Sequence, residues 1–512
     1  MLMRRHWPLL AVLAPALALR AAAWFAVQPA WWLLGDSIGY LDDAMHLQPD
    51  RWRPSGYSLL LLRPLEPAHQ LALVTAVQHL MGLGVGALVY VTLTRLGLPR
   101  WAAALAAVPA LYDGYVVAGE QMLAAESLFV LLVVGAVALL LWSRDRPDEL
   151  TVYAAGLLLA LATLTRVVGL PLVAVAALAL LLPRPSVSRL VALCLPFVVV
   201  VGGYALWFSQ TYGRVELTAS NGVFLYGRTT NFVDCSAVRF SDPKLRQLCP
   251  REPVGQRNEV WYVFDVNSPV ATMGLSPAAA DDLAGRFARQ AIAAQPAGFV
   301  ALAWDGMVKS FGWDQSALPN DMRFDAGQRL PDAAVATGLA YQRTDPRPVY
   351  RAPLSGLLAR YQGVVSVPAT LCLVALLVAV AGLAFGRDPE ARGLRRALLL
   401  TGGAAAVLLL VPAVTAIAAP RYRVPAIPLL CLTVAISGSL LVNRWRTRRP
   451  AYAVGTVATP TTCQPSRFRG TGSASSGRKT AIAARAASDG SAAPVPPASS
   501  TIRSPRRMTT SR

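Results

Sequence analysis

Charged residues and histidines are scarce in this chain. Only 15% of its 512 residues are charged, four are histidine, and the sequence contains no Cys-x-x-Cys pair. The usual sequence signatures of a His- or Cys-based metal site are therefore missing. In contrast, 54% of the residues are hydrophobic, and long apolar runs recur along the chain. This composition excludes an ordinary soluble enzyme and indicates a polytopic membrane protein.

The long apolar runs predict the membrane topology. About 20 apolar residues cross the hydrocarbon core of a bilayer. Arginines flank alternate spans, and with the N-terminus inside they satisfy the positive-inside rule. We therefore predict a plasma-membrane protein with both termini in the cytoplasm. The expected fold is all-α, with juxtamembrane helices and about ten transmembrane helices: 7–33, 70–94, 101–118, 122–142, 151–165, 167–183, 189–208, 362–385, 397–418 and 424–442.

Four regions follow from this topology. Residues 1–208 form an N-terminal transmembrane module with a polar first outer loop, and 362–442 form the C-terminal transmembrane helices. Residues 209–361 are expected outside the cytoplasm, and about 150 residues are too many for a simple connector. Residues 443–512 contain 13 Lys or Arg and one Asp. We interpret them as a disordered cytoplasmic tail attracted to anionic lipid rather than to nucleic acid.

Two cysteines of the outer segment are candidates for a disulfide. Cys235 and Cys249 share one polar loop, whereas three of the other four cysteines lie in apolar stretches and the last lies in the tail. Disulfides persist in oxidising compartments. If the loop is exported, we expect these two residues to pair.

Charged residues at the outer ends of the spans are the main functional signal. The stretch "GDSIGYLDDA" follows the first apolar run and contains three aspartates. Taken singly, a charge near the hydrocarbon is also compatible with a snorkelling side chain or a structural ion pair. We expect the latter for Arg20, with a buried carboxylate or a carbonyl as its partner. Convergence on one face indicates a site for a lipid phosphate and an acceptor hydroxyl. The outer arginines are Arg51, Arg53, Arg166, Arg421 and Arg423.

Five motifs resemble those of a known group. In chain order they are "GDSIGYLDDA", "RWRPSGYSLLL", "EQMLAAESLFVLL", "ATLTRVVGLPL" and "APRYRVPAIPLL". Over about residues 1–440 the chain resembles the GT-C superfamily of polytopic glycosyltransferases, in its protein mannosyltransferase and aminoarabinose transferase-like branch. Some relatives use histidines in a metal site, whereas the extracytoplasmic histidines expected here are His46 and His69. We predict no cofactor, although Asp36 and Glu126 are able to hold a divalent cation as in other branches.

The resemblance implies transfer of a sugar from a polyprenyl-phosphate donor to an acceptor hydroxyl on the extracytoplasmic face. It implies Asp36 as the general base and Glu126 as a residue that orients the acceptor. Asp42 and Asp43 are less certain catalytic candidates, because they either line the same groove or are simply solvated. The expected substrate- and phosphate-binding residues are Tyr40, Arg53, Tyr57, Arg166, Arg421, Tyr422 and Arg423.

The sequence names neither the sugar nor the acceptor, which is an envelope glycan, a lipid or a protein. Two other readings stay open at this point. A transporter or flippase of a lipid-linked or anionic solute also carries intramembrane charges, but such proteins often show internal repeats that this sequence lacks. A structural scaffold leaves the outer arginines unexplained.

Overall fold

The computed structural model describes residues 5–143, 147–182, 185–313, 322–324, 327–385, 392–416 and 419–448. These residues belong to one compact unit, and the second unit, residues 451–512, lies outside the described part. Most of the predicted tail therefore lies outside it too. Its first residues are not disordered, because the last helix, α20, runs from Ile427 to Arg448.

The structure is predominantly helical, as predicted. Among the described residues, five helices are long and apolar enough to cross a membrane, and the number rises to eight if each of three bent helix pairs counts as one span. Three shorter apolar helices lie where further spans were predicted. The helices of the first half are α2 (Trp7–Ala26), α5 (Leu71–Arg95), α6 (Arg100–Tyr112), α7 (Gly114–Glu120), α8 (Glu126–Leu140), α9 (Glu149–Thr165), α10 (Leu172–Leu181) and α11 (Val187–Tyr212).

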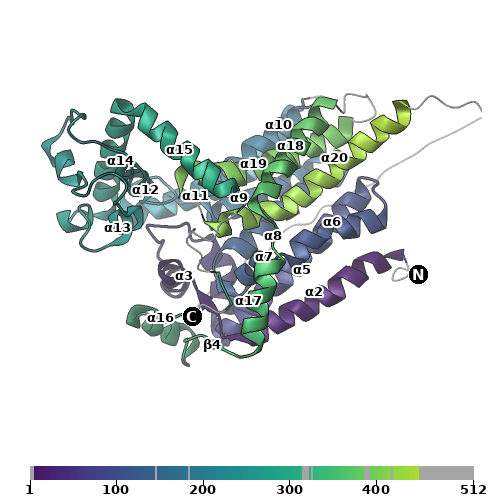
Figure 1. Ribbon diagram of the computed structural model, residues 1–512, viewed down its shortest axis with the longest axis horizontal. Helices are drawn as coiled ribbons and strands as arrows, with labels where there is room; N and C mark the ends of the chain where they lie inside the picture. Colours follow the sequence, from purple (N-terminus) through teal and green to yellow (C-terminus); the bar gives the residue numbers. More distant parts are fainter. Residues whose placement is uncertain are drawn as a thin grey trace, which may run out of the picture. The chain divides into compact units, whose positions relative to one another are not determined.

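Close helix packing in this half depends on small residues. Gly156 on α9 faces α11 so closely that a Cβ atom would lie 2.2 Å from the carbonyl oxygen of Leu193. Small residues allow two backbones to approach when both helices are surrounded by lipid. Figure 1 shows α2, α5, α6 and α20 running in similar directions, with α12, α13 and α14 gathered near one end of the bundle.

The first predicted span ends earlier than expected. Helix α2 stops at Ala26, and the chain continues in extended conformation as β1 (Val27–Gln28) and β2 (Trp31–Trp32). Pro29 lies between them and has no N–H to continue a helix. Strand β1 pairs antiparallel with β4 (Val349–Tyr350), and β2 pairs in parallel with β3 (Met122–Leu123). Each pairing ties the end of the first helix to a distant part of the chain.

The segment between α11 and α18 (Ala369–Phe385) is largely helical. It has its own small core, in which Phe287 and Tyr226 are fully buried. The helix predicted from "SPAAADDLAGRFARQAIAAQP" is present as α14, capped by the Ser276 hydroxyl, and α15 follows after a bend of 102°. The helices are α12 (Asn221–Thr230), α13 (Glu259–Phe264), α14 (Pro277–Ala294), α15 (Pro296–Phe311), α16 (Asp332–Gln342) and α17 (Leu354–Val364).

The remaining elements are mostly short. They are α3 (Leu34–His46), the π-helix η1 (Ser58–Leu62), α4 (Arg63–Leu65), the 3-10 helices η2 (Glu66–Ala68), η3 (Val167–Gly169), η4 (Pro243–Leu248), η5 (Ala271–Met273) and η7 (Pro420–Ala426), and α19 (Arg392–Thr415).

Candidate active site

Asp36 lies in the first turn of α3, which begins two residues after β2. A carboxylate is favourable there because the N-terminal end of a helix carries partial positive charge. The Ser37 hydroxyl accepts a hydrogen bond from the Leu33 N–H at 2.8 Å and donates one to the Leu123 carbonyl at 2.7 Å. These bonds fix the first turn of α3 against β3, which lies just before α8. The Asp36 side chain is 21% exposed, so substrate has access to it.

Arg53 joins Asp36 to a second carboxylate. It donates a hydrogen bond to Asp36 Oδ1, and its Nη1 lies 3.5 Å from Asp50 Oδ2. Burial is the largest influence on Asp50 and raises its pKa, while the Trp52 N–H and Arg53 oppose the rise. Sequence reasoning missed Asp50. The available signal was its place three residues before Arg53 in the same short loop.

Glu126 and Arg166 form the second ion pair of the site. Glu126 is the first residue of α8, and Arg166 directly follows α9, the helix that packs beside α8. Arg166 Nη1 donates to Glu126 Oε1, while Glu126 Oε2 is buried with no hydrogen-bond partner among the described residues. One oxygen of Glu126 is thus committed, and the other is available to a ligand.

Arg421 brings the C-terminal helices to the site. It lies in η7, just before α20, and its Nη1 is 4.0 Å from Asp36 Oδ2. Its charge also interacts with Glu126. Arg421 therefore lies near both carboxylates, and its 4.0 Å contact is longer than the Arg53 and Arg166 contacts with them. The neighbouring Tyr422 hydroxyl accepts a hydrogen bond from Arg421 Nη2 at 3.3 Å.

The charged side chains described above form one cluster, and two buried tyrosines, the tyrosine floor of the site, pack beside it. The cluster consists of Asp36, Arg53, Glu126, Arg166 and Arg421. The rings of Tyr40 and Tyr57 meet edge to face with centroids 4.9 Å apart, and the Arg53 guanidinium lies 5.9 Å from the centroid of Tyr40. Both tyrosines are at most 4% exposed. Their burial leaves little of either ring open to a substrate.

The other predicted site residues lie elsewhere. Asp42 is exposed and pairs with His46 at 3.0 Å. Asp43 is buried beside Ser55 and Ser58, and burial raises its pKa to about 7. The Arg423 guanidinium lies over the Tyr115 ring at 4.6 Å, and that of Arg51 lies over Trp52 at 4.3 Å. The cluster thus contains three of the five outer arginines.

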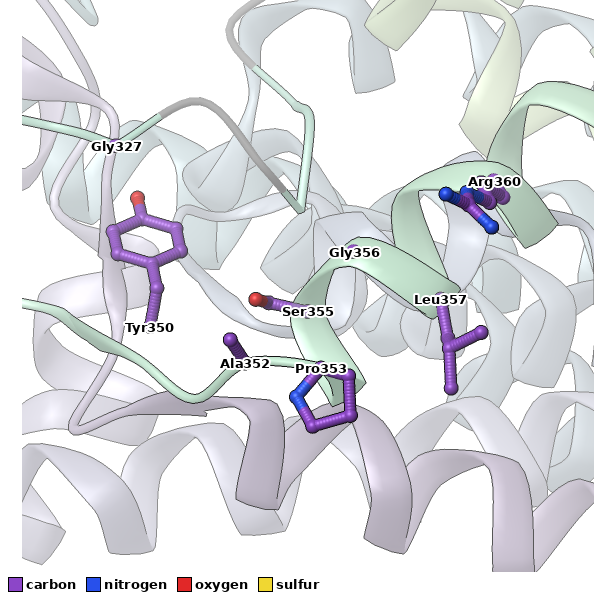
Figure 2. Close-up of a pocket in the computed structure, with 8 residues that line it drawn as sticks. All are labelled: Gly327, Tyr350, Ala352, Pro353, Ser355, Gly356, Leu357 and Arg360. Carbon is purple, nitrogen blue, oxygen red and sulfur yellow. The ribbon is translucent and has the colours of Figure 1, made fainter.

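A small, mostly apolar cavity of about 20 Å³, with room for about one water molecule, reaches the Glu126 side chain. Its walls come from α5, α6, α7, α8, η7 and α20, including Val85, Val130 and Val424. A larger hollow of about 410 Å³ lies at the start of α17 (Figure 2). It is lined by Tyr350, Ser355 and Arg360 among others, and no predicted site residue reaches it.

Three further expectations bear on the surroundings of the site. Arg20, which is 1% exposed, forms a 2.7 Å ion pair with Glu120 and donates to the Leu111 carbonyl at 2.8 Å, so its expected structural role is confirmed. The structure joins Cys235 and Cys249 in a disulfide. In the described part of the chain, no three His, Cys, Asp or Glu side chains come together as a metal site.

Comparison with known proteins supports the resemblance seen in the motifs. Residues 66–212 match the model of the dolichyl-phosphate-mannose-protein mannosyltransferase family, which is a GT-C family. The matched stretch contains Glu126 and Arg166, whereas Asp36, Arg53 and Arg421 lie outside it. The chain has no significant match among curated proteins or solved structures. This match is consistent with the suspected GT-C relationship, and with the apolar helices it supports a membrane glycosyltransferase.

Proposed function

We propose that this chain transfers a sugar from a polyprenyl-phosphate donor to an acceptor hydroxyl on the extracytoplasmic face of the membrane. One observation carries the proposal. Asp36 and Glu126 come from separate helices and meet Arg53, Arg166 and Arg421, which come from three further segments. Arginine is suited to phosphate, and carboxylates are suited to proton transfer and to hydroxyl binding.

Asp36 is the proposed general base. It removes the proton of the acceptor hydroxyl while the acceptor oxygen forms a bond to C1 of the sugar. The bond between C1 and the phosphate oxygen breaks, and polyprenyl phosphate leaves as an anion. Glu126 orients the acceptor through its second oxygen, which has no hydrogen-bond partner among the described residues. Stabilising charge as it develops is the largest part of such catalysis.

Arg421 is the proposed main contact to the donor phosphate. Arg53 and Arg166 each hydrogen-bond a carboxylate, whereas Arg421 is 4.0 Å from its nearest carboxylate oxygen. A divalent cation held by Asp36 and Glu126 would face three arginines, so the charges favour an anionic ligand at this position.

The proposed topology has ten spans, with 1–208 and 362–442 in the membrane, 209–361 outside the cytoplasm and both termini inside. Two features support the outer location of 209–361. One is the disulfide between Cys235 and Cys249, and the other is that arginines flank the loops assigned to the cytoplasmic side. The proposed tail beyond α20 then lies at the cytoplasmic surface. The acceptor remains an envelope glycan, a lipid or a protein.

The proposal is tested by sugar transfer in proteoliposomes with a panel of labelled polyprenyl-phosphate sugars and membrane extract as acceptor. We expect one donor to be used, and Asp36→Asn to lower kcat by about 10²- to 10⁴-fold. Arg421→Gln should mainly raise KM for the donor. Asp282→Asn is the matched control, because Asp282 is half-exposed on α14 and pairs with Arg286. Full activity of Asp36→Asn would refute the assignment of the base.

A further inference from the structure

A buried side chain of α5 hydrogen-bonds the backbone at the short link between α7 and α8, residues 121–125. Gln78 is fully buried, and its Nε2 donates hydrogen bonds to the carbonyl oxygens of Glu120 at 2.9 Å and Met122 at 2.8 Å. Its Oε1 accepts a hydrogen bond from the Tyr57 hydroxyl at 2.7 Å. One amide therefore connects the tyrosine floor of the site to the link that leads into Glu126.

His79, the next residue of α5, holds the side chains of the same link. Its Nδ1 lies 2.8 Å from Glu120 Oε2, and its Nε2 lies 2.9 Å from Gln121 Oε1. Arg20 binds the other oxygen of Glu120. The Gln121 amide donates to the Val27 carbonyl at 2.6 Å. Buried polar groups of this kind rigidify a structure when each has a partner, because a lost hydrogen bond is costly there.

The same link also binds the segment that leads to Asp36. The Trp31 N–H donates to the Gln121 carbonyl at 3.0 Å, and Trp31 and Trp32 pair in parallel with Met122 and Leu123. Asp36 follows Trp32 by four residues, and Glu126 follows Leu123 by three. The positions of both carboxylates therefore depend on the pairing of β2 with β3.

We propose that Gln78 and His79 are positioning residues that fix the link between α7 and α8, and thereby set Glu126 relative to Asp36. The inference rests on the proposed function in one respect, namely that these two carboxylates act together. The hydrogen bonds described here for Gln78 and His79 go to Tyr57, Glu120, Gln121 and Met122, and not to the carboxylates or arginines of the cluster. Their effect is on geometry, and a displacement of about 1 Å at a reacting group lowers a rate by up to about 10²-fold.

Gln78→Met is the main test, because it keeps the length of the side chain and removes all three hydrogen bonds. We expect kcat to fall about 10- to 10²-fold with donor KM changed by less than about twofold. Amide hydrogen exchange should become faster in peptides 27–33 and 120–125. Thr92→Val is the matched control. Thr92 is buried near the other end of α5, and its hydroxyl has no hydrogen-bond partner among the described residues.

A milder variant, His79→Gln, keeps a polar side chain and should give a smaller change of the same kind. Unchanged exchange in both peptides would overturn the claim that α5 holds the link. Faster exchange with unchanged kcat would overturn the claim that the link positions the carboxylates. If the wild type transfers no sugar, the proposed function fails, whereas the exchange measurement still decides whether Gln78 holds the link.

Discussion

Gly56 sets the distance between two arginines of the site. A Cβ atom at this position would lie 2.4 Å from the carbonyl carbon and oxygen of Leu164 and 2.6 Å from the Thr165 nitrogen. Ordinary contacts begin at 3.4 Å, so Gly56→Ala requires the two backbones to separate by about 1 Å. Arg53 and Arg166 are attached to these two backbones. Because a shift of this size misplaces catalytic groups, we expect a loss of about 10²-fold in kcat/KM.

The assay is sugar transfer by purified protein in proteoliposomes, with the amount of folded protein measured by thermal unfolding. Gly35→Ala is the control, because no atom outside its chain neighbours and its own helix backbone lies within 4 Å of the added Cβ and the residue directly precedes Asp36. It should retain wild-type activity. If Gly56→Ala keeps both wild-type activity and wild-type Tm, the close approach of these two segments does not set the geometry of the site.

Three further predictions concern stability, measured by thermal unfolding in detergent. Gly82→Ala would place a Cβ 1.8 Å from Glu120 Oε1 and separate its buried ion pair with Arg20, which should lower the free energy of unfolding by about 3 to 5 kcal/mol. The control Gly84→Ala meets one side-chain atom at 3.7 Å and should leave stability unchanged. Burial raises the Asp43 pKa from 3.8 to about 7, so ionisation is resisted in the folded state. Wild type should lose up to about 4 kcal/mol as pH rises from 4 through 7, and Asp43→Asn should not; equal pH profiles would contradict this. Reducing the Cys235–Cys249 disulfide, which closes a loop of 14 residues, should cost about 3 kcal/mol; an unchanged Tm would contradict that estimate.

The charges of the site were predictable because their positions are costly near a membrane. Asp36, Arg53, Glu126, Arg166 and Arg421 each stand at the end of an apolar run, where only a paired or functional charge is tolerated. Their residue types and positions therefore predicted that they gather, and the structure brings them together, while the chemistry assigned to them is our proposal. The helical fold was predictable for a related reason, since apolar segments in lipid must satisfy their backbone hydrogen bonds internally.

The contacts that place these charges were not predictable. The parallel pairing of Trp31 and Trp32 with Met122 and Leu123 joins two-residue strands across about 90 residues of chain, and no periodicity marks strands of that length. The sequence pattern explains Gly56 only as a residue that breaks the chain before a helix. The structure shows instead that it allows contact with a backbone more than 100 residues away.

Arg423 shows where charge alone misleads. It stands two residues after Arg421 and carries the same charge, but in η7 its guanidinium lies over Tyr115. Asp42 and Asp43 diverge in the same way. They are adjacent on α3, and the helix directs one to solvent and the other to the interior. Which member of such a pair reaches the site depends on helix orientation, which tertiary packing decides.

The most direct test of the proposed function is the amount of polyprenyl phosphate released for each sugar transferred by the wild-type protein in proteoliposomes. The proposed reaction breaks the bond between C1 and the phosphate oxygen each time that the acceptor bond forms, so release should equal transfer, and both should disappear together in Asp36→Asn. Movement of intact donor from one leaflet to the other, with no release of polyprenyl phosphate, would contradict the glycosyltransferase function and indicate a flippase.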